Sequence, residues 1–226
     1  MRHRRLPVFV RENGLLLASL GLFGVFFIGM VFSGAATYNQ EQQQHGSADR
    51  VSVLAYLTTG DFVEAMFENW ESEFLQMGMY VVLTAYLYQR GSSESKSLTD
   101  PAPQDQDPRQ VTPNRWTPWP VRKGGWVLRI YEHSLAIAFF ALFVASFALH
   151  AVGGVKAFNS EQSQHGEAAI SVWRYLTTAQ FWFESMQNWQ SEFIAVAAIV
   201  GLSIVLRHRG SSESKPVAEP HRHTGS

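Results

Sequence analysis

The sequence predicts an all-α membrane protein with four transmembrane helices, built from a tandem parallel repeat of helical hairpins with outer-side helical extensions. Two observations predict the membrane: residues 15–36 carry no charge, and residues 135–155 are equally apolar except for His150. A bilayer core about 30 Å thick needs about 20 helical residues at about 1.5 Å each, so each run is long enough to cross it. A third observation predicts the repeat, because the two halves match at an offset of 119 to 120 residues.

The first apolar run follows basic residues, as the core of a secretory signal does. However, a signal core usually has about 7–15 apolar residues, and residues 15–36 form a longer run. Its counterpart at 135–155 lies in the middle of the chain. We therefore expect both runs to be membrane helices. The chain contains no cysteine, which excludes disulfides and thiolate metal sites.

Two shorter apolar runs, 74–88 and 193–206, complete the hairpins. Each follows a helix-start pattern, "TTGD" or "TTAQ", in which a threonine is the expected N-cap. Each run ends in basic residues beside a glycine, which is typical of a helix C-terminus. Each second helix should then have about 30 residues and measure about 45 Å. A short amphipathic helix at about 48–58 should join the outer tips of the first hairpin. The expected N-caps and terminal glycines are Thr58, Thr177, Gly91 and Gly210.

The repeat is visible in long matching segments. "YNQEQQQHG" at 38–46 matches "FNSEQSQHG" at 158–166, and "RGSSESK" occurs identically at 90–96 and 209–215. Each unit crosses the membrane twice, so both units have the same orientation, which is a parallel repeat. The predicted divisions are a first two-helix repeat at 1–90, a Pro-rich cytoplasmic linker at 91–125 acting as a tether, a second two-helix repeat at 126–209 and a disordered tail at 210–226.

The distribution of charge predicts the topology. Residues 1–14, 89–134 and 207–226 contain 15 of the 18 Lys and Arg residues, and basic loops face the cytoplasm. Residues 37–73 and 156–192 contain 11 of the 19 acidic residues. We therefore expect a multi-pass protein of the plasma membrane with both termini and the linker in the cytoplasm, and with an acidic outer face.

Two nearly identical segments, "NWESEF" from Asn69 and "NWQSEF" from Asn188, suggest a site near the outer membrane boundary. In each segment an Asn and a Glu lie four residues apart and so share a helical face. The Glu lies about 25 Å from the inner end of the helix. A carboxylate at that depth is costly, which indicates either a proton or cation site or hydrogen bonds between helices at a boundary. The Trp after each Asn is an expected interface anchor. The predicted site residues are Asn69, Glu73, Asn188 and Glu192, and the predicted anchors are Trp70 and Trp189.

Three further groups of polar residues are weaker candidates. A Glu and a His four residues apart, once per half, have a spacing that can ligate a metal. We interpret them as outer helix ends with local hydrogen bonds, so no metal and no other cofactor is expected. The weak metal candidates are Glu41, His45, Glu161 and His165. His150 has no counterpart in the first half, where Met30 stands, and is expected to form a hydrogen bond between helices.

The segments "RENGL", "YNQEQQQHG", "NWESEFLQM", "RGSSESK", "RKGGWVL" and "FALHAVGG" resemble those of an uncharacterised bacterial membrane-protein family, classed as a domain of unknown function. The resemblance covers nearly the whole chain outside the linker and the tail. It implies a bacterial inner-membrane protein with this duplicated two-helix unit. It implies no activity.

Three functional classes are compatible with these features. The first is a non-enzymatic scaffold, stress-related or partner-binding four-helix bundle, and the second is a small proton or cation transporter or channel with Glu73 and Glu192 at its outer mouth. The third is a metal-dependent enzyme of the outer face. No nucleophile motif, phosphate loop or HExxH pattern supports it, so we do not expect an enzyme. The expected partners are the lipid bilayer, a second copy through small helix residues and a cytoplasmic protein at the linker, with no nucleic acid.

Overall fold

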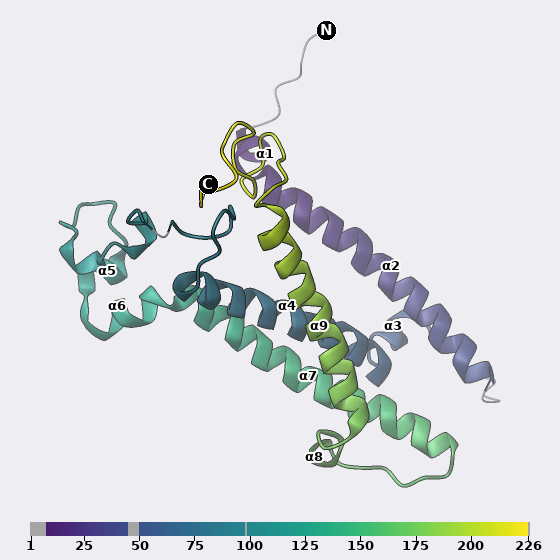
Figure 1. Ribbon diagram of the computed structural model, residues 1–226. Helices are drawn as coiled ribbons and strands as arrows, with labels where there is room; N and C mark the ends of the chain where they lie inside the picture. The colour runs from purple at the N-terminus through teal and green to yellow at the C-terminus, as the bar shows by residue number, and fades with distance from the viewer. Residues whose placement is uncertain (1–7, 45–49, 98, 226) are drawn as a thin grey trace. The chain divides into compact units, whose positions relative to one another are not determined.

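The computed structural model describes residues 8–44, 50–97 and 99–225, and these residues form helices without any strand (Figure 1). They belong to two compact units. The first comprises the chain up to Ala65 together with Ala151–Tyr175, and the second comprises Met66–His150 together with the chain from Leu176 onward. The elements are α1 Val8–Glu12, α2 Gly14–Gln44, α3 Val53–Tyr56, α4 Gly60–Tyr86, η1 Pro103–Asp105, η2 Pro108–Gln110, α5 Trp119–Lys123, α6 Gly125–Glu132, α7 Ser134–Gln164, α8 Val172–Tyr175 and α9 Ala179–Leu202.

Helices α2 and α7 are the two described helices that are long and apolar enough to cross a membrane. Each has 31 residues, and only 6% of the most apolar stretch of α2 and 17% of that of α7 is buried. A core helix of a water-soluble protein would bury this surface. Both helices also extend beyond the apolar run, as the sequence predicts: α2 continues past Glu41 and α7 past Glu161.

The second helices of the hairpins start one residue later than predicted. The hydroxyl of Thr59 accepts a hydrogen bond from the Phe62 N–H at 3.2 Å, and the hydroxyl of Thr178 accepts one from the Phe181 N–H at 3.3 Å. The prediction of Thr58 and Thr177 as N-caps was therefore wrong by one position. A Thr–Thr pair offers two candidate caps, and backbone dihedrals decide which hydroxyl reaches the third following N–H.

The same helices also end earlier than predicted, α4 at Tyr86 and α9 at Leu202, so the expected ends beside Gly91 and Gly210 were wrong. The serines of the two "RGSSESK" segments explain this difference. Ser95 Oγ accepts from the Gln89 N–H at 2.9 Å, and Ser214 Oγ accepts from the His208 N–H at 2.9 Å. Serine hydroxyls that bond the backbone in this way compete with the helical ladder and end the helix.

Two asparagines, one near the end of α2 and one near the end of α7, make matching hydrogen bonds. The Asn39 side chain donates to the carbonyl of Val51 and accepts from its N–H, at 3.0 and 2.8 Å. The Asn159 side chain makes the same pair of bonds to Ile170, at 2.9 and 2.8 Å. The first pair is 12 residues apart and the second 11, so the change in repeat offset from 120 to 119 falls inside this loop. The helices that follow, α3 and α8, have four residues each and are shorter than the expected helix at about 48–58.

In the first unit, the start of α4 lies directly against the end of α7. A Cβ added to Gly60 would lie 2.8 Å from the Gly153 carbonyl oxygen, and one added to Gly153 would lie 2.5 Å from the Glu64 N–H nitrogen. Only glycine permits two backbones to approach this closely. The hydroxyl of Tyr175 donates to Glu64 Oε1 at 3.0 Å and closes this contact from α8.

In the second unit, α4, α7 and α9 surround the candidate site. Gly78 of α4 lies against Phe139 of α7, where an added Cβ would be 3.3 Å from the Phe139 Cβ. Phe147 of α7 packs edge-on against Phe181 of α9, with ring centroids 5.2 Å apart. Figure 1 shows α4 running beside α7. These aromatic and glycine contacts bring polar residues of the three helices together.

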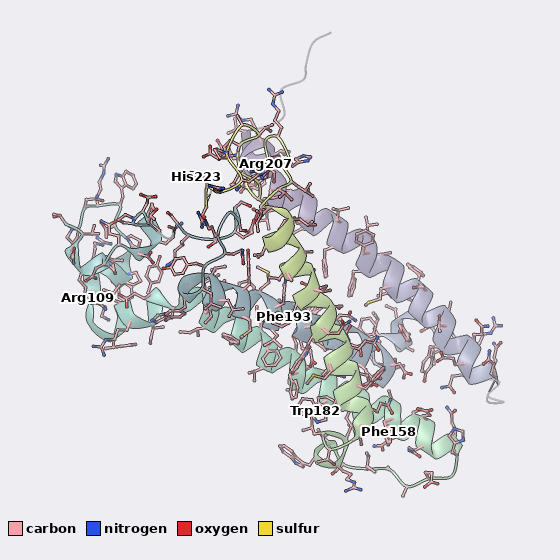
Figure 2. The ribbon with its side chains drawn as sticks, viewed as in Figure 1. Arg109, Phe158, Trp182, Phe193, Arg207 and His223 are labelled. Carbon is pink, nitrogen blue, oxygen red and sulfur yellow. The ribbon has the colours of Figure 1, made fainter. Side chains whose placement is uncertain are left out.

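The C-terminal segment, for which the sequence predicts disorder, makes defined hydrogen bonds in the second unit. Lys215 is fully buried, and its ammonium donates to the carbonyls of Gly91, His221 and His223. The Gly91 N–H in turn donates to Thr224 Oγ1 at 2.9 Å. Arg207 and His223 lie in this folded-back region (Figure 2). The segment is too polar to form a core of its own, and a single lysine satisfied by three carbonyls holds it in place.

Candidate functional site

The candidate site begins with a fully buried ion pair between two helices. His150 on α7 and Glu71 on α4 both have no exposed side-chain surface, and His150 Nδ1 lies 3.1 Å from Glu71 Oε2. A buried charge is costly unless it is paired and hydrogen-bonded. The remaining polar atoms of both side chains therefore need partners as well.

The second oxygen of Glu71 accepts two hydrogen bonds from α9. The buried hydroxyl of Ser185 donates to Oε1 at 2.8 Å, and the Trp189 indole N–H donates to the same oxygen at 3.2 Å. With His150, three donors from two helices converge on one carboxylate. Both oxygens of Glu71 therefore have hydrogen-bond partners inside the protein, as a buried carboxyl group requires.

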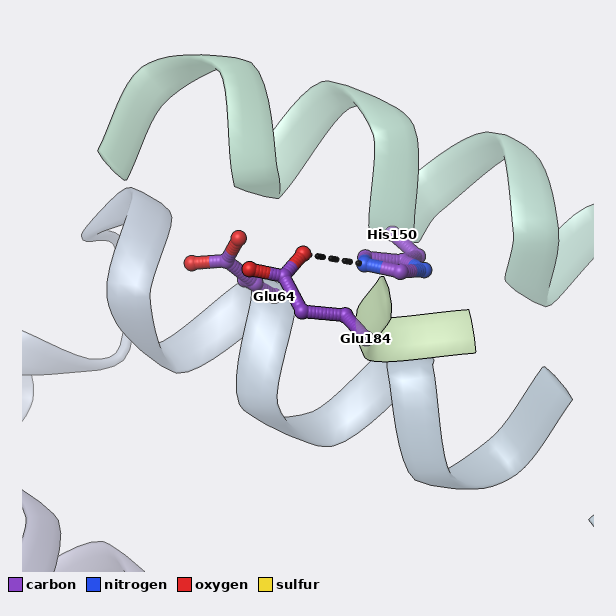
Figure 3. A group of neighbouring side chains, drawn as sticks. All are labelled: Glu64, His150 and Glu184. Carbon is purple, nitrogen blue, oxygen red and sulfur yellow. Dashed lines mark hydrogen bonds and ion pairs between the residues drawn. The ribbon is translucent and has the colours of Figure 1, made fainter. Parts of the chain in front are cut away.

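The other nitrogen of His150 faces a second carboxylate. His150 Nε2 lies 3.4 Å from Glu184 Oε2 on α9, and Figure 3 shows this pair. A neutral imidazole carries one N–H donor, whereas the imidazolium carries two. Because both ring nitrogens face carboxylate oxygens, the protonated ring satisfies both contacts and the neutral ring satisfies only one. The ionic cluster, comprising Glu71, His150, Glu184, Ser185 and Trp189, therefore provides a place for one proton between two carboxylates.

Aromatic rings form the wall of the ionic cluster. The fully buried ring of Phe181 stacks on the His150 ring, with centroids 4.8 Å apart and an interplanar angle of 29°. Trp189 packs edge-on against Phe143 at 6.0 Å. A low-dielectric wall strengthens the interactions of the charges inside it. Glu184 is the more accessible carboxylate, since 19% of its side chain is exposed whereas Glu71 has none.

Glu68 extends the cluster by one helical turn. It lies three residues before Glu71 on α4, is partly buried, and forms a side-chain hydrogen bond with Asn188 of α9. It also interacts electrostatically with His150 and with Glu184. The predicted site residue Asn188 is thus brought to the cluster, with Glu68 as its acidic partner in place of the predicted Glu192.

The other predicted site residues lie on a different face. Glu73 and Asn69 are exposed, Glu192 is partly buried, and Glu73 acts electrostatically on Glu192. The two repeated glutamates are therefore electrostatic neighbours. The fully buried carboxylate of "NWESEF" is however Glu71, two positions before Glu73, and a helix turns by about 200° over two residues.

The two tryptophans predicted as interface anchors are both partly buried. Trp70 packs edge-on against Phe67 and Phe74, with centroids 5.4 and 6.2 Å apart. Trp189 has the additional polar contact with Glu71. Tryptophan with a buried N–H usually donates to a partner, so Trp189 takes part in the cluster besides any role at the interface.

The weak metal candidates lie apart from the ionic cluster in sequence. Glu41, Glu161 and His165 are exposed, and Glu161 acts electrostatically on Asp61 of α4. His45 lies outside the described residues. The Glu–His pairs are repeated in both halves, whereas the ionic cluster is made chiefly of residues that the repeat does not duplicate.

A family model described as "Domain of unknown function (DUF6766)" matches residues 6–226. No curated protein and no solved structure matches the chain.

Proposed function

We propose that this chain, which belongs to the DUF6766 family over nearly its whole length, is a proton-responsive membrane protein. In this proposal it is a small transporter or channel, and its ionic cluster binds and releases a proton. The observation that carries this proposal is the position of His150, with both ring nitrogens facing carboxylates at 3.1 and 3.4 Å and with no exposed surface. An ionisable residue inside apolar membrane helices usually marks a functional site, and here its partners are Glu71 and Glu184.

We place the protein in the inner membrane with four crossings and both termini in the cytoplasm. The 15-to-3 division of Lys and Arg supports this topology. The 27 residues of α4 and the 24 of α9 correspond to about 40 and 36 Å, which is enough to span a core of about 30 Å. The matching asparagine–loop and serine–backbone hydrogen bonds of the two halves support a tandem duplication.

The cluster then lies in the outer part of the membrane. His150 follows Leu135, the first residue of its apolar run, by 15 positions, or about 22 Å along the helix. It is five residues from Val155, the outer end of the run. The acidic outer face would concentrate protons and cations, and Glu68 and Glu184 would connect that face to His150.

Proton binding at the cluster follows from its chemistry. A carboxylate, an imidazole and a second carboxylate give three sites whose protonation is coupled, because each charge acts on the next. Both oxygens of Glu71 already have hydrogen-bond partners, Ser185 and Trp189 on Oε1 and His150 on Oε2. We therefore assign the transferable proton to His150 or Glu184, and Glu184 is the group with solvent-exposed surface.

The test is proton flux in liposomes that contain the purified protein and a trapped pH-sensitive dye. We expect the wild-type protein to dissipate an imposed pH gradient faster than empty liposomes, and Glu71→Gln and His150→Gln to lose this activity. Glu73→Gln is the matched control, with the same chemical change two residues away on an exposed position, and should keep it. Size-exclusion profiles establish that each variant is folded.

A second measurement does not depend on variants. Nuclear magnetic resonance of ¹⁵N-labelled histidine distinguishes an imidazolium from either neutral tautomer. We expect His150 to show two protonated nitrogens at neutral pH and to change state when the gradient is applied. A folded wild-type protein that shows neither flux nor a titrating His150 would overturn the proposal.

A non-enzymatic scaffold is the rival proposal, and one observation favours it. The cluster joins α4, α7 and α9 through five side chains, and buried polar networks can fix helix register. Under this proposal Glu71→Gln would lower the stability of the protein. The wild-type protein and the variant would both show no more proton flux than empty liposomes. The flux assay therefore separates the two.

A further inference from the structure

We infer that residues 115–129 form a binding site for anionic phospholipid headgroups. The segment contains three tryptophans, Trp116, Trp119 and Trp126, and four cations, Arg115, Arg122, Lys123 and Arg129. It contains no acidic residue. This combination of aromatic and basic residues is typical of protein that lies in the headgroup layer of a membrane.

The tryptophans and the cations of this segment are exposed and lie close to one another. Trp116 is 77% exposed and Trp126 is 70% exposed. The Arg115 guanidinium lies 4.6 Å from the centroid of the Trp116 ring, and Lys123 Nζ lies 4.8 Å from that of Trp119 and 6.0 Å from that of Trp126. A cation beside an aromatic face presents charge and apolar surface at one position, which suits the boundary between phosphate and acyl chain.

The ion pairs of the described residues involve other cations than these four. Elsewhere in the same loop, Lys96 pairs with Asp105 at 2.6 Å, and Arg109 pairs with Asp107 at 3.2 Å and Glu132 at 3.0 Å. Figure 2 shows Arg109 in this loop. Within residues 8–44, 50–97 and 99–225, no ion pair involves Arg115, Arg122, Lys123 or Arg129. The segment therefore has its full positive charge available for an external anion.

Two features favour a lipid surface over a protein partner. The segment ends six residues before Leu135, where the apolar run of α7 begins, so its distance from the membrane is limited to about 9 Å of helix. Helix α6 buries Leu128 and leaves Trp126 and Ile130 exposed. Exposed apolar side chains next to a spanning helix find their partner in the bilayer, and clustered Lys and Arg attract anionic headgroups.

The absence of cysteine permits a direct test in the full-length protein. A polarity-sensitive dye on Val121→Cys, the only thiol, reports the environment of α5 in liposomes of phosphatidylcholine alone or with about one third phosphatidylglycerol. We expect a blue-shifted emission only with the anionic lipid, reversed by 0.5 M salt because surface charge is screened over about one Debye length. The comparison of the two lipids needs no substitution other than the labelled Val121→Cys.

A charge-matched pair of variants identifies the residues. The double variant Arg122→Gln with Lys123→Gln should bind the anionic surface less tightly. We expect the ratio of lipid-bound to unbound segment to fall by about fivefold for each cation removed. Lys96→Gln with Arg109→Gln removes the same charge from cations that already have partners, and should leave the emission unchanged. Equal losses in both double variants would show general charge attraction and would contradict a site at 115–129.

Two results would overturn the inference. The first is an equally blue-shifted emission in neutral and anionic liposomes, which would show that headgroup charge is not recognised. The second is an aqueous dye environment in both lipids, which would leave the segment to a soluble anionic partner. Neither result bears on proton flux, so failure here is distinguishable from failure of the proposed function.

Discussion

The Nδ1 atom of His150 lies 3.1 Å from Oε2 of Glu71, although the two residues are 79 positions apart and neither side chain is exposed. The pair joins α4 to α7, and Ser185 and Trp189 of α9 complete the coordination of the carboxylate. Three helices thus depend on one buried charge. The first two predictions follow from removing parts of this arrangement.

Replacing the buried glutamate should destabilise the protein, whereas replacing its exposed neighbour should not. Glu71→Gln leaves His150 charged and without its main partner, and breaking a buried pair from one side costs about 3–5 kcal/mol. Glu73→Gln should have little effect, because Glu73 is exposed. Denaturant unfolding in detergent, followed by circular dichroism, measures the free energy of unfolding of both variants. Equal stability of the two would contradict the assignment of Glu71 to the core.

Replacing the whole charge cluster should be less harmful than replacing the histidine alone. Met30 occupies the position equivalent to His150 in the first half. His150→Met leaves Glu71 and Glu184 without a cation, and we expect a large loss of stability. The triple variant that adds Glu71→Gln and Glu184→Gln removes the uncompensated charges and should recover part of that loss. A triple variant less stable than His150→Met would show that the carboxylates have other partners.

The C-terminal segment should be released by one substitution. Lys215→Met removes an ammonium with three carbonyl acceptors, and each charge-assisted bond contributes about 1.5–3 kcal/mol. Amide hydrogen exchange of residues 216–225 should increase strongly. Lys96→Met, which removes the equivalent lysine of the first "RGSSESK" segment, is the matched control and should leave exchange of the tail unchanged.

The docking of this tail should also depend on pH. Burial lowers the pKa of the Lys215 ammonium from its ordinary value of 10.5, and the Arg207 guanidinium lowers it further. In the window between the lowered pKa and 10.5, the free tail binds more protons than the docked tail. Docking should therefore strengthen as pH rises through this window. Exchange protection, corrected for intrinsic rates, that instead fell with rising pH would contradict this sign.

The proposed topology makes the loop at Gly166 external and residues 89–134 cytoplasmic. A periplasm-active reporter fused at Gly166 should be active, and the same reporter fused in the linker should be inactive. The physical reason is the concentration of Lys and Arg in the linker and at both ends. Activity of the linker fusion would require an odd number of crossings before it.

Several elements of the fold could be predicted because they depend on local chemistry. The length and apolarity of α2 and α7 follow from two uninterrupted runs of residues, since helical rise and bilayer thickness are fixed. The starts of α4 and α9 were predicted within one residue from paired threonines. The ends were not, because Ser95 and Ser214 reach back to the backbone from beyond the helix.

The candidate site was harder to predict because the repeat drew attention to the wrong residues. Aligned at the repeat offset, Glu68 corresponds to Gln187, Glu71 to Gln190, His150 to Met30, Glu184 to Ala65 and Ser185 to Met66. At each of these positions the ionisable or hydroxyl side chain occurs in only one half. A search for polar residues that break the repeat inside apolar helices would have found the cluster.

The sequence by itself determined the two long apolar helices, the hairpin starts, the repeated segments and the asymmetric distribution of charge, because each depends on residues close together in the chain. Only the tertiary structure decided which carboxylate of "NWESEF" is buried and which residues meet it. Glu71 and Glu73 differ by about 200° around one helix. The orientation of that helix is set by packing against α7 and α9, through contacts such as Gly78 with Phe139 and Glu71 with Ser185. A buried carboxylate is tolerable only where donors from other helices converge, and their convergence is a property of three helices together.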